Sequence, residues 1–340
     1  MTGKRIRVLV VDDSLVFREV IARGISSDPM IEVVGKAVDP YDARDKILQY
    51  QPDVMTCDVE MPKMNGIEFI RRLLPQYPLP VIVISTVSEA VFDAMNAGAV
   101  DFVTKPDVQA PRNVENFIYD LISKIKIAVN ANVTQHLTTK SPNTIETDIK
   151  FNQNRVIAIG ASTGGTEAIF SVLNQLPPTI PGILIVQHIP PVFSRMFAER
   201  MNNQTQLKCK EAQSGDYVEQ GKVFIAPGDQ HIKIRKVGEK YKVEAFYGDR
   251  VNGHCPSVDI LFDSVAKEVG HNAIGIILTG MGYDGAKGLL SMRQKGAKTL
   301  GQDRQSCVVY GMPKVAYEMG AVERQVSLSN IPRELLSILK

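Results

Sequence analysis

Residues 155–165, RVIAIGASTGG, place a serine between glycines at the end of an apolar run. Residues 160–164 fit the pattern G-x-S-x-G and lie between a predicted buried strand and a predicted helix. A tight turn there exposes the Ser162 hydroxyl, and the start of the helix favours negative charge that develops beside it. Glycine turns of this kind also bind phosphate through their backbone N–H groups. The motif alone leaves two interpretations open, a nucleophilic serine and a phosphate-binding loop.

The next predicted strand helps to separate the two interpretations. A dinucleotide-binding loop requires an acidic residue at the end of that strand to hold the ribose, whereas GILIVQH ends in His188. A histidine there suits a general base for Ser162. The glycine-rich loop ILTGMGYDG supplies Asp284 after another apolar strand, so we predict a catalytic triad at one edge of a sheet. The chain order Ser, His, Asp differs from that of the α/β-hydrolases, so their fold is not expected.

Other residues near this site have predicted supporting roles. The backbone N–H groups around Met281 and Gly282 are the candidates for an oxyanion hole, and Thr163, next to the serine, is expected to support it. His254 is a rival base, and Cys255 beside it allows a Cys–His pair to be considered. Adjacent side chains rarely face each other and no nearby residue would lower the thiol pKa, so we favour a loop histidine that contacts substrate or backbone.

A second group of reactive residues lies in the first third of the chain. Five residues end or follow a predicted strand: Asp12, Asp13, Asp58, Ser85 and Lys105. They should converge, because the carboxyl ends of parallel strands share one edge of a sheet. Carboxylates gathered there favour Mg²⁺, which would let Asp58 attack a phosphoryl donor while Lys105 and Ser85 contact the phosphate. For any single acid, a helix N-cap or a turn is the alternative interpretation.

The apolar pattern predicts two sheets that would position these residues. From residue 6 onward, five short apolar runs alternate with five amphipathic stretches, which is typical of a parallel sheet with both faces covered. We therefore predict a doubly wound α/β domain, (βα)5, over residues 1–128. The following stretch is rich in Asn and Thr and has no apolar period, so residues 129–152 are predicted to be a linker.

Residues 153–340 are predicted to form a second α/β domain. Its predicted strands are RVIAIG, GILIVQH, KVFIAP and AIGIILTG, with helical stretches such as TEAIFSVLNQL and VFSRMFAERMN between them. The segment HIKIRKVGEKYKVEAFYG alternates with period 2 around a Gly-Glu turn, as a hairpin does. We expect a mostly parallel sheet with an antiparallel hairpin.

Composition narrows the class of protein. A chain of 340 residues suits two domains, and a formal net charge of +2 gives no reason to expect nucleic acid or an anionic membrane as partner. The first apolar run is short and ends in acids, so it is neither a signal peptide nor a membrane span. The 4 cysteines show no C-x-x-C spacing, which argues against a zinc site or a disulfide framework. We expect a cytoplasmic protein without direct membrane insertion.

The segments VDDS, DVEMPKMNG, VISTVS and AGAVDFVTKP resemble the response-regulator receiver family. The resemblance implies phosphorylation of Asp58 by a histidine kinase. It implies that Mg²⁺ is held by two side chains and a backbone carbonyl, with one more acid behind them: Asp13, Asp58, the carbonyl of Glu60, and Asp12. It also implies that Ser85 and Phe102 form the pair that shifts on phosphorylation, with Lys105 beside them.

The second domain resembles the CheB-type chemotaxis protein-glutamate methylesterase family in IGASTGG, VQHIPPVFSRMFAERMN, VFIAPGDQHIKI, RVNGHCPSVDILFDSVA and ILTGMGYDGAKGL. The resemblance implies hydrolysis of γ-glutamyl methyl esters on the cytoplasmic helices of chemoreceptors, and deamidation of receptor glutamines, without a cofactor for the hydrolysis. The family more often has arginine at the positions of Gly253 and Cys255, which bears on how this loop would bind an acidic receptor surface. The alternative function is a non-catalytic output domain whose glycine loop binds a nucleotide or a phosphorylated partner.

Overall fold

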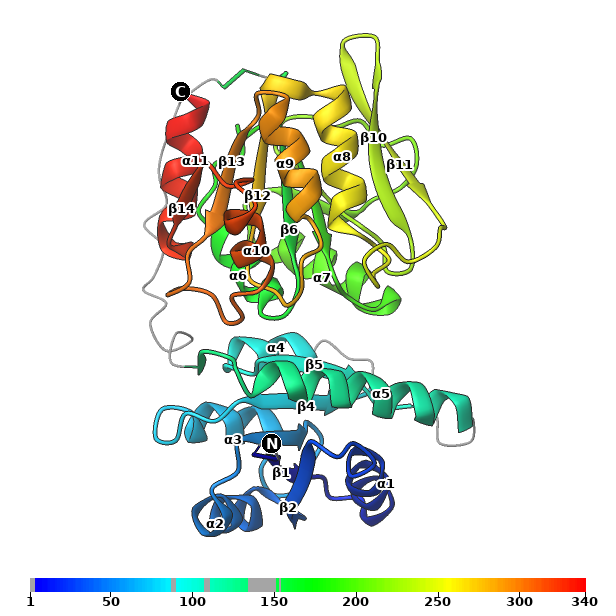
Figure 1. Ribbon diagram of the computed structural model, residues 1–340, viewed down its shortest axis with the longest axis vertical. Coiled ribbons are helices and arrows are strands. Elements are labelled where there is room, and N and C mark those ends of the chain that lie inside the picture. The colour runs from blue at the N-terminus through cyan, green and yellow to red at the C-terminus, as the bar shows by residue number, and fades with distance from the viewer. Residues whose placement is uncertain (1–3, 87–89, 107–110, 134–150, 153) are drawn as a thin grey trace. The chain divides into compact units, whose positions relative to one another are not determined.

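The computed structural model describes residues 4–86, 90–106, 111–133, 151–152 and 154–340. The chain separates into two compact units, Met1–Thr139 and Lys140–Lys340, which Figure 1 shows in blue to green and in green to red. The division falls outside the described residues, as does most of the predicted linker. The boundaries at residues 128/129 and 152/153 therefore stay predictions.

The N-terminal unit is one five-stranded parallel sheet in the order β2-β1-β3-β4-β5. Its strands are β1 (Ile6–Val11), β2 (Ile31–Ala37), β3 (Val54–Asp58), β4 (Val81–Ser85) and β5 (Asp101–Thr104). Its helices are α1 (Leu15–Ile25), α2 (Pro40–Tyr50), α3 (Gly66–Leu73), α4 (Ala90–Asn96) and α5 (Pro111–Ala128). Strand and helix alternate throughout, which confirms the predicted doubly wound (βα)5 domain.

The C-terminal unit contains a seven-stranded parallel sheet in the order β14-β13-β12-β6-β7-β9-β8, and a separate antiparallel hairpin. The parallel strands are β6 (Val156–Ala161), β7 (Ile183–Gln187), β8 (Lys208–Glu211), β9 (Lys222–Ile225), β12 (Ala273–Ile277), β13 (Lys298–Gln302) and β14 (Arg324–Val326). The hairpin is β10 (His231–Val237) and β11 (Lys240–Phe246). The mostly parallel sheet with an antiparallel hairpin is confirmed.

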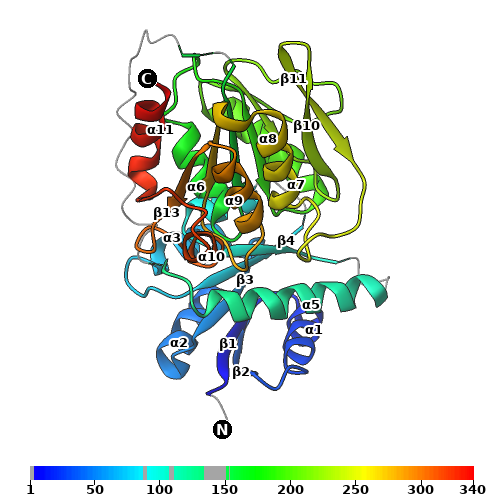
Figure 2. The ribbon, with the colours of Figure 1, turned by 45° about the horizontal axis from the view of Figure 1, so that its top comes forward.

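Helices connect the strands of this second sheet. They are α6 (Gly165–Leu173), α7 (Pro191–Gln204), α8 (Val258–Glu268), α9 (Ala286–Gln294), α10 (Met312–Glu318) and α11 (Ile331–Leu339), with 3₁₀ turns at Gly270–Asn272 and Leu328–Asn330. Figures 1 and 2 both show α8 lying between α9 and the hairpin. The hairpin therefore packs against α8 in addition to the sheet and α9.

The packing of α8 explains why β10 and β11 alternate in sequence. Side chains of one hairpin face, such as Ile232 and Val243, join the same core cluster as Leu261 and Phe262 of α8. The other hairpin face carries charged side chains such as Lys233. In contrast, all six residues of β6 are buried, as expected for a central strand with both faces covered. The alternating pattern of the hairpin therefore reflects burial of one face, and the continuous apolar run of β6 reflects burial of both faces.

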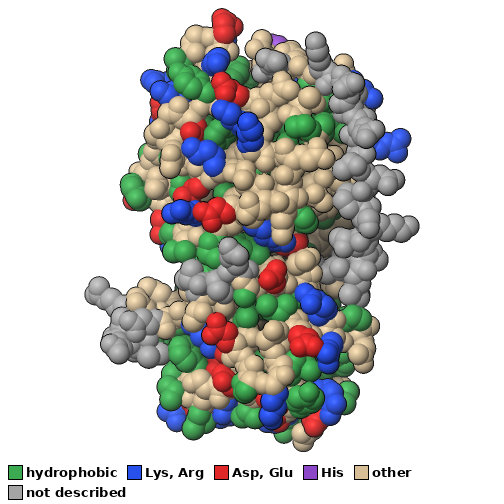
Figure 3. Space-filling model, turned by 180° about the vertical axis from the view of Figure 1, so that it is seen from behind, with side chains coloured by type: hydrophobic (Ala, Val, Ile, Leu, Met, Phe, Trp, Pro, Cys, Tyr) green, Lys and Arg blue, Asp and Glu red, His purple; other side chains and the backbone are tan. Residues whose placement is uncertain are grey.

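Among the described helices, none combines the length and the apolar character needed to cross a bilayer. On the face seen in Figure 3, Lys and Arg side chains are interspersed with Asp and Glu among the described residues. This mixed charge agrees with the small net charge of the sequence, +2.

A glycine allows α8 to approach the central strand closely. A Cβ atom at Gly160 would lie 2.2 Å from Val258 Cγ1, at the first residue of α8. We expect Gly160→Ala to lower the free energy of unfolding by about 1–3 kcal/mol, because the added methyl group displaces the helix. In the double variant with Val258→Ala, the loss of unfolding free energy, measured by urea denaturation, should be smaller than the sum of the losses in the two single variants. Additive losses would contradict this contact.

Candidate functional site

The central strand of the C-terminal sheet is a topological switch point. Strand β6 is flanked by β7 on one side and by β12 on the other. In open parallel sheets, ligands bind at the carboxyl edge where the strand order reverses in this way. Ser162 follows β6, His188 follows β7, and Asp284 lies in the loop after β12. All three predicted triad residues are therefore at this edge.

The backbone of Ser162 is held from several directions. Ser162 N donates to Thr279 O at 3.0 Å, and Ser162 O accepts from Gly165 N at 2.7 Å. The side chain of Gln187, on the neighbouring strand, donates from Nε2 to Ser162 O at 2.9 Å. A Cβ atom at Gly280 would lie 2.7 Å from Ser162 Cβ, so only glycine leaves room for the serine. The turn that presents the hydroxyl is thus rigidly supported.

His188 lies beside this turn and is oriented by Asp284. The register pairs Ala161 with Gln187, and His188 N donates to Ala161 O at 3.1 Å. His188 Nε2 is 2.9 Å from Asp284 Oδ2. Since an ionised carboxylate only accepts, Nε2 carries the proton and the lone pair is on Nδ1. Nδ1 is buried and has no hydrogen-bond partner, so it is the nitrogen available to a nucleophile.

The structure gives no hydrogen bond between Ser162 Oγ and His188 within the residues it describes. Catalytic hydrogen bonds are often long before substrate binds and shorten in the reacting complex. The predicted Ser162, His188, Asp284 triad therefore has its base and its orienting acid joined, and the link from base to nucleophile stays a prediction.

Asp284 is buried, with 1% of its surface exposed. Five groups donate to its carboxylate: His188 Nε2 (2.9 Å), Asn252 Nδ2 (2.8 Å), Ser257 Oγ (2.7 Å), Val258 N (2.7 Å) and Asp259 N (3.3 Å). The last two are the first N–H groups of α8, whose positive helix end also favours an anion. Burial alone would raise the pKa of Asp284, but hydrogen bonds from His188, Asn252 and Ser257 hold it well below its usual range.

His254, which the sequence offers as a rival base, enters the same site. Its ring stacks on His188, with centroids 3.7 Å apart and an angle of 9° between the planes. Burial, together with the neighbouring His188, lowers the pKa of His254 to about 4, so its ring is neutral near pH 7. The favoured prediction, a loop histidine that contacts substrate or backbone, did not include this stacking on His188. Burial also raises the pKa of the Cys255 thiol, which weakens it as a nucleophile.

The candidate oxyanion loop is fixed by the segment before α10. Gly280 N donates to Val309 O at 3.0 Å, and Gly311 N donates to Gly280 O at 3.0 Å. Within the described residues, the backbone N–H groups of Met281 and Gly282 have no hydrogen-bond acceptor. Thr163 is buried, and its carbonyl accepts from Thr279 Oγ1 at 3.0 Å. The N–H groups after β12 are thus available to bind an anion.

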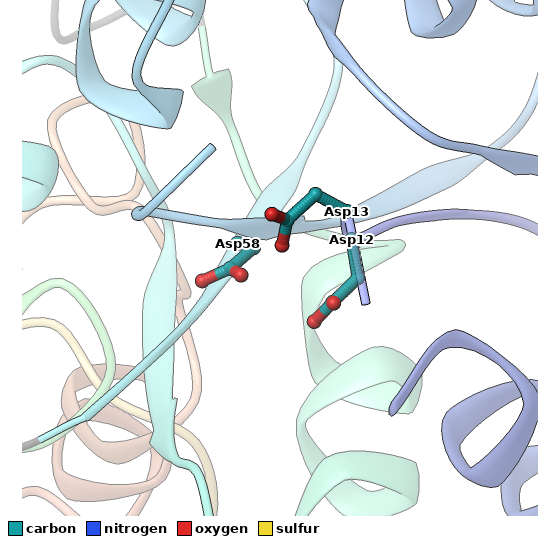
Figure 4. A group of neighbouring side chains, drawn as sticks. All are labelled: Asp12, Asp13 and Asp58. Carbon is teal, nitrogen blue, oxygen red and sulfur yellow. The ribbon is translucent and has the colours of Figure 1, made fainter. Parts of the chain in front are cut away.

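The predicted carboxylates of the N-terminal unit also come together. Oxygen atoms of Asp12, Asp13 and Asp58 all lie within 4.8 Å of one another, and Figure 4 shows the three side chains at the ends of β1 and β3. Lys105 Nζ is 2.5 Å from Asp58 Oδ2 and 3.1 Å from Asp12 Oδ2. Glu60 N donates to Asp58 Oδ1 at 3.3 Å. Strand β1 is the switch point of this sheet, as β6 is of the other.

This acidic cluster is short of positive charge. Burial raises the pKa of Asp58 to about 6 and also raises that of Asp12, against the opposing effect of Lys105. Burial alone would lower the pKa of Lys105, but its contacts with Asp58 and Asp12 raise it. The buried atom Ser85 Oγ has no hydrogen-bond partner within the described residues, and Asp12 Oδ2 has the Lys105 ammonium group at 3.1 Å, which it shares with Asp58. Three neighbouring carboxylates, two of which share one lysine, fit a hard divalent cation such as Mg²⁺.

The predicted switch residues lie on adjacent strands. Ser85 ends β4, and Phe102 lies in β5, where it pairs in register with Val83. Both Ser85 and Phe102 are buried, with 1% and 5% of their surface exposed. The Nζ atom of Lys124 lies 5.2 Å from the centroid of the Phe102 ring. Their roles in switching stay predictions.

Comparison with known proteins assigns both units. A family model described as the response regulator receiver domain matches residues 8–113, and one described as CheB methylesterase matches residues 157–335. The solved catalytic domain of the Thermotoga maritima CheB methylesterase superposes with a TM-score of 0.53 at 35% sequence identity, covering 54% of this chain and 98% of that one.

Full-length relatives match both units together. A protein-glutamate methylesterase/protein-glutamine glutaminase 2 of Syntrophomonas wolfei is 55% identical over 100% of this chain and 99% of its own length. A protein-glutamate methylesterase/protein-glutamine glutaminase of Escherichia coli K12 is 45% identical over 98% of this chain and 97% of its own length.

Fold, site and relatives together define a response regulator whose receiver domain is followed by an enzymatic α/β domain. The chain belongs to the CheB methylesterase family.

The Asp284 carboxylate should stabilise the fold as well as orient the base. We expect Asp284→Ala to lower the free energy of unfolding of the C-terminal unit by about 3 kcal/mol or more, because it leaves buried donors unsatisfied. The matched control Asp263→Ala, exposed on α8, should change it by less than about 0.5 kcal/mol. Because the folded pKa is depressed, the difference between wild type and Asp284→Ala should shrink as pH falls below 3.8. Equal losses in the two variants would contradict this.

Asp58 should have the opposite effect on stability. Since folding raises its pKa from 3.8 to about 6, its stability contribution becomes increasingly unfavourable as pH rises through that window. We expect Asp58→Asn to stabilise the N-terminal unit more above about pH 7 than below about pH 4, and Mg²⁺ to raise the melting temperature of wild type and of the control but not that of Asp58→Asn. Asp45→Asn, which removes an exposed aspartate of α2, is the control. An equal Mg²⁺ shift in all three proteins would exclude this cation site.

Proposed function

We propose that this protein hydrolyses γ-glutamyl methyl esters of chemoreceptors, releases methanol, and deamidates receptor glutamines, under the control of phosphorylation at Asp58. The observation that carries the proposal is the His188–Asp284 pair, at 2.9 Å, in which His188 Nδ1 has no hydrogen-bond partner and the His188 backbone is bonded to Ala161, next to Ser162. The names of relatives that match nearly the full chain support the same activity. The predicted triad supplies its chemistry without a cofactor.

In the proposed mechanism, His188 Nδ1 takes the proton of Ser162 Oγ while the oxygen attacks the ester carbonyl. The negative charge that develops on the carbonyl oxygen is stabilised by the N–H groups of Met281 and Gly282. His188 returns the proton to the leaving methoxide, which departs as methanol and leaves an acyl-enzyme. Water, deprotonated by His188, then releases the glutamate carboxylate and restores Ser162. A glutamine side chain follows the same steps with ammonia as the leaving group.

The receiver is proposed to control this activity through its acidic edge. A histidine kinase would supply the phosphoryl group, and Asp58 would attack it as the carboxylate nucleophile. When bound by Asp13, Asp58 and the Glu60 carbonyl, Mg²⁺ supplies positive charge that neutralises the phosphoryl oxygens. Lys105 Nζ, which lies 2.5 Å from Asp58 Oδ2, and the unpartnered Ser85 Oγ would contact the phosphate. The proposed substrates of the C-terminal unit, whose activity the receiver would control, are the cytoplasmic helices of chemoreceptors.

The geometry favours the nucleophile over the phosphate-binding loop. A phosphate at the start of α6 would be bound by backbone N–H groups, and one of them, Gly165 N, already donates to Ser162 O at 2.7 Å. A binding loop would also leave the buried His188–Asp284 pair without a role. No specific observation supports the non-catalytic alternative.

The test is covalent labelling combined with turnover. We expect a fluorophosphonate to label wild type at Ser162, and Ser162→Ala to lose both labelling and methanol release by several orders of magnitude while retaining its melting temperature. Receptor membranes carrying methyl-labelled glutamates, with and without acetyl phosphate, provide the substrate assay. A phosphodonor should accelerate wild type.

Ser291→Ala is the matched control, since the Ser291 hydroxyl is exposed on α9 and donates to Lys287 O. It should label and turn over as wild type does. Methanol release by Ser162→Ala at the wild-type rate would exclude the serine mechanism. Absence of both labelling and turnover in phosphorylated wild type would exclude the proposed function.

A further inference from the structure

The side chain of Asn252 lies between two buried carboxylates. Its Nδ2 atom is 2.8 Å from Asp284 Oδ1 and 2.7 Å from Asp259 Oδ2. Asp284 and Asp259 have only 1% and 6% of their surface exposed. Each amide N–H therefore has one carboxylate acceptor, and both acceptors are poorly solvated. An amide group in this place links two like charges that would otherwise repel each other.

Asp259 in turn ties this link to the start of α9. Its Oδ1 atom accepts from Gly288 N at 2.7 Å, while Oδ2 accepts from Asn252. The Asp259 side chain is thus held at both oxygens and gives Asn252 a fixed anchor. Asp284 Oδ1 also accepts from Ser257 Oγ, so Oδ1 faces the 252–257 loop and Oδ2 faces His188 Nε2. The rotation of the Asp284 carboxylate depends on these donors.

The backbone of Asn252 has a second consequence for the base. Asn252 and Gly253 have φ values of 54° and 85°, and Val251 and His254 exchange both backbone hydrogen bonds at 2.9 Å. This is a two-residue turn in the left-handed region, which asparagine and glycine tolerate best. The turn places the His254 ring on the His188 ring, with 3.7 Å between centroids. Asn252 therefore contacts or positions both neighbours of the His188 ring, the Asp284 carboxylate and the His254 ring.

We propose that Asn252 is a positioning residue for His188. Its amide fixes the Asp284 carboxylate so that Oδ2 meets His188 Nε2, and its turn holds His254 against the imidazole face. The inference rests on the proposed hydrolase function and adds to it a residue outside the Ser162, His188, Asp284 set.

The role of the amide can be separated from that of the turn. Asn252→Gly keeps a residue that accepts the left-handed conformation but removes the amide, whereas Asn252→Asp keeps the size and replaces the donor by an acceptor. If Asn252 only shapes the turn, its replacement by glycine should leave the catalytic rate unchanged. If Asn252 positions the base, the rate should fall, because Asp284 loses a hydrogen-bond donor and Asp259 loses its partner.

The experiment compares phosphorylated full-length wild type, Asn252→Gly and Asn252→Asp on methyl-labelled receptor membranes. We expect kcat of Asn252→Gly to fall about 10- to 100-fold with KM little changed, since a hydrogen bond to a charged group in the orienting set is lost. Asn252→Asp should fall further. The rate of fluorophosphonate labelling, which needs no receptor, should fall in parallel in both variants.

Asn202→Ala is the matched control, because Asn202 Oδ1 accepts a 3.1 Å hydrogen bond from Cys209 N away from the site. It should retain kcat and labelling even if its melting temperature falls. Wild-type kcat in Asn252→Gly, or a rise in KM with unchanged labelling, would overturn the positioning role. If wild type itself neither labels nor turns over, the proposed function fails instead.

Discussion

The ionised Asp284 carboxylate is the constraint on which the C-terminal site depends. An unpaired buried charge costs several kcal/mol, so it is tolerated only where hydrogen bonds replace water. Its five donors come from the end of β7, from the loop before α8, and from the first turn of α8 itself. These segments are distant in sequence and must be in place together. The hydrogen bonds to the Asp284 carboxylate therefore hold together most of the segments that form the candidate site.

The two units use the same edge of the same kind of sheet but balance their charges differently. In the receiver, Asp12 and Asp58 share one lysine, Lys105, and burial leaves the pKa of Asp58 raised to about 6. In the C-terminal unit, donors hold the pKa of Asp284 low. Where the negative charge of the carboxylates is only partly balanced, as in the receiver, the sheet edge favours a bound cation and a reactive carboxylate. Where hydrogen-bond donors balance the charge, as around Asp284, the carboxylate stays ionised and orients a base. Environments that push carboxyl pKa values apart in this way commonly mark distinct chemical roles.

The sequence predicts what depends on local pattern. Buried strands, their order along the chain and the residues at their ends follow from apolar runs and glycine turns, so Ser162, His188 and Asp284 were found at one edge. Strands β8 and β14 were missed because KCKE and RQV are short, polar and lie at the two edges of the sheet, where little apolar burial is needed. Strand β13, KTLGQ, mixes Thr, Gly and Gln and gives no clear apolar run.

The site residues that were missed act through contacts between distant segments. The Asn-Gly dipeptide at 252–253 signals a tight turn, but no sequence pattern says that its amide reaches Asp259 and Asp284. His231 shows the same limit. It is buried at the start of β10, where Nδ1 accepts from Ser257 N and Nε2 faces Asp249 O. A lone histidine in an alternating strand reads as structural, and only the fold shows that it supports the loop beside the base.

These contacts also determine how far the base must reorganise when it reacts. During proton transfer His188 becomes positive, and a site that has to rotate its dipoles at that moment loses part of its electrostatic stabilisation. Here the Asp284 carboxylate is already held at both oxygens, and the ring is already stacked on a neutral His254. A protonated His254 would repel the developing imidazolium, so the burial that lowers its pKa to about 4 keeps the stack compatible with catalysis near neutral pH. The fold therefore establishes the orientation and the charge state of the base's neighbours before substrate arrives.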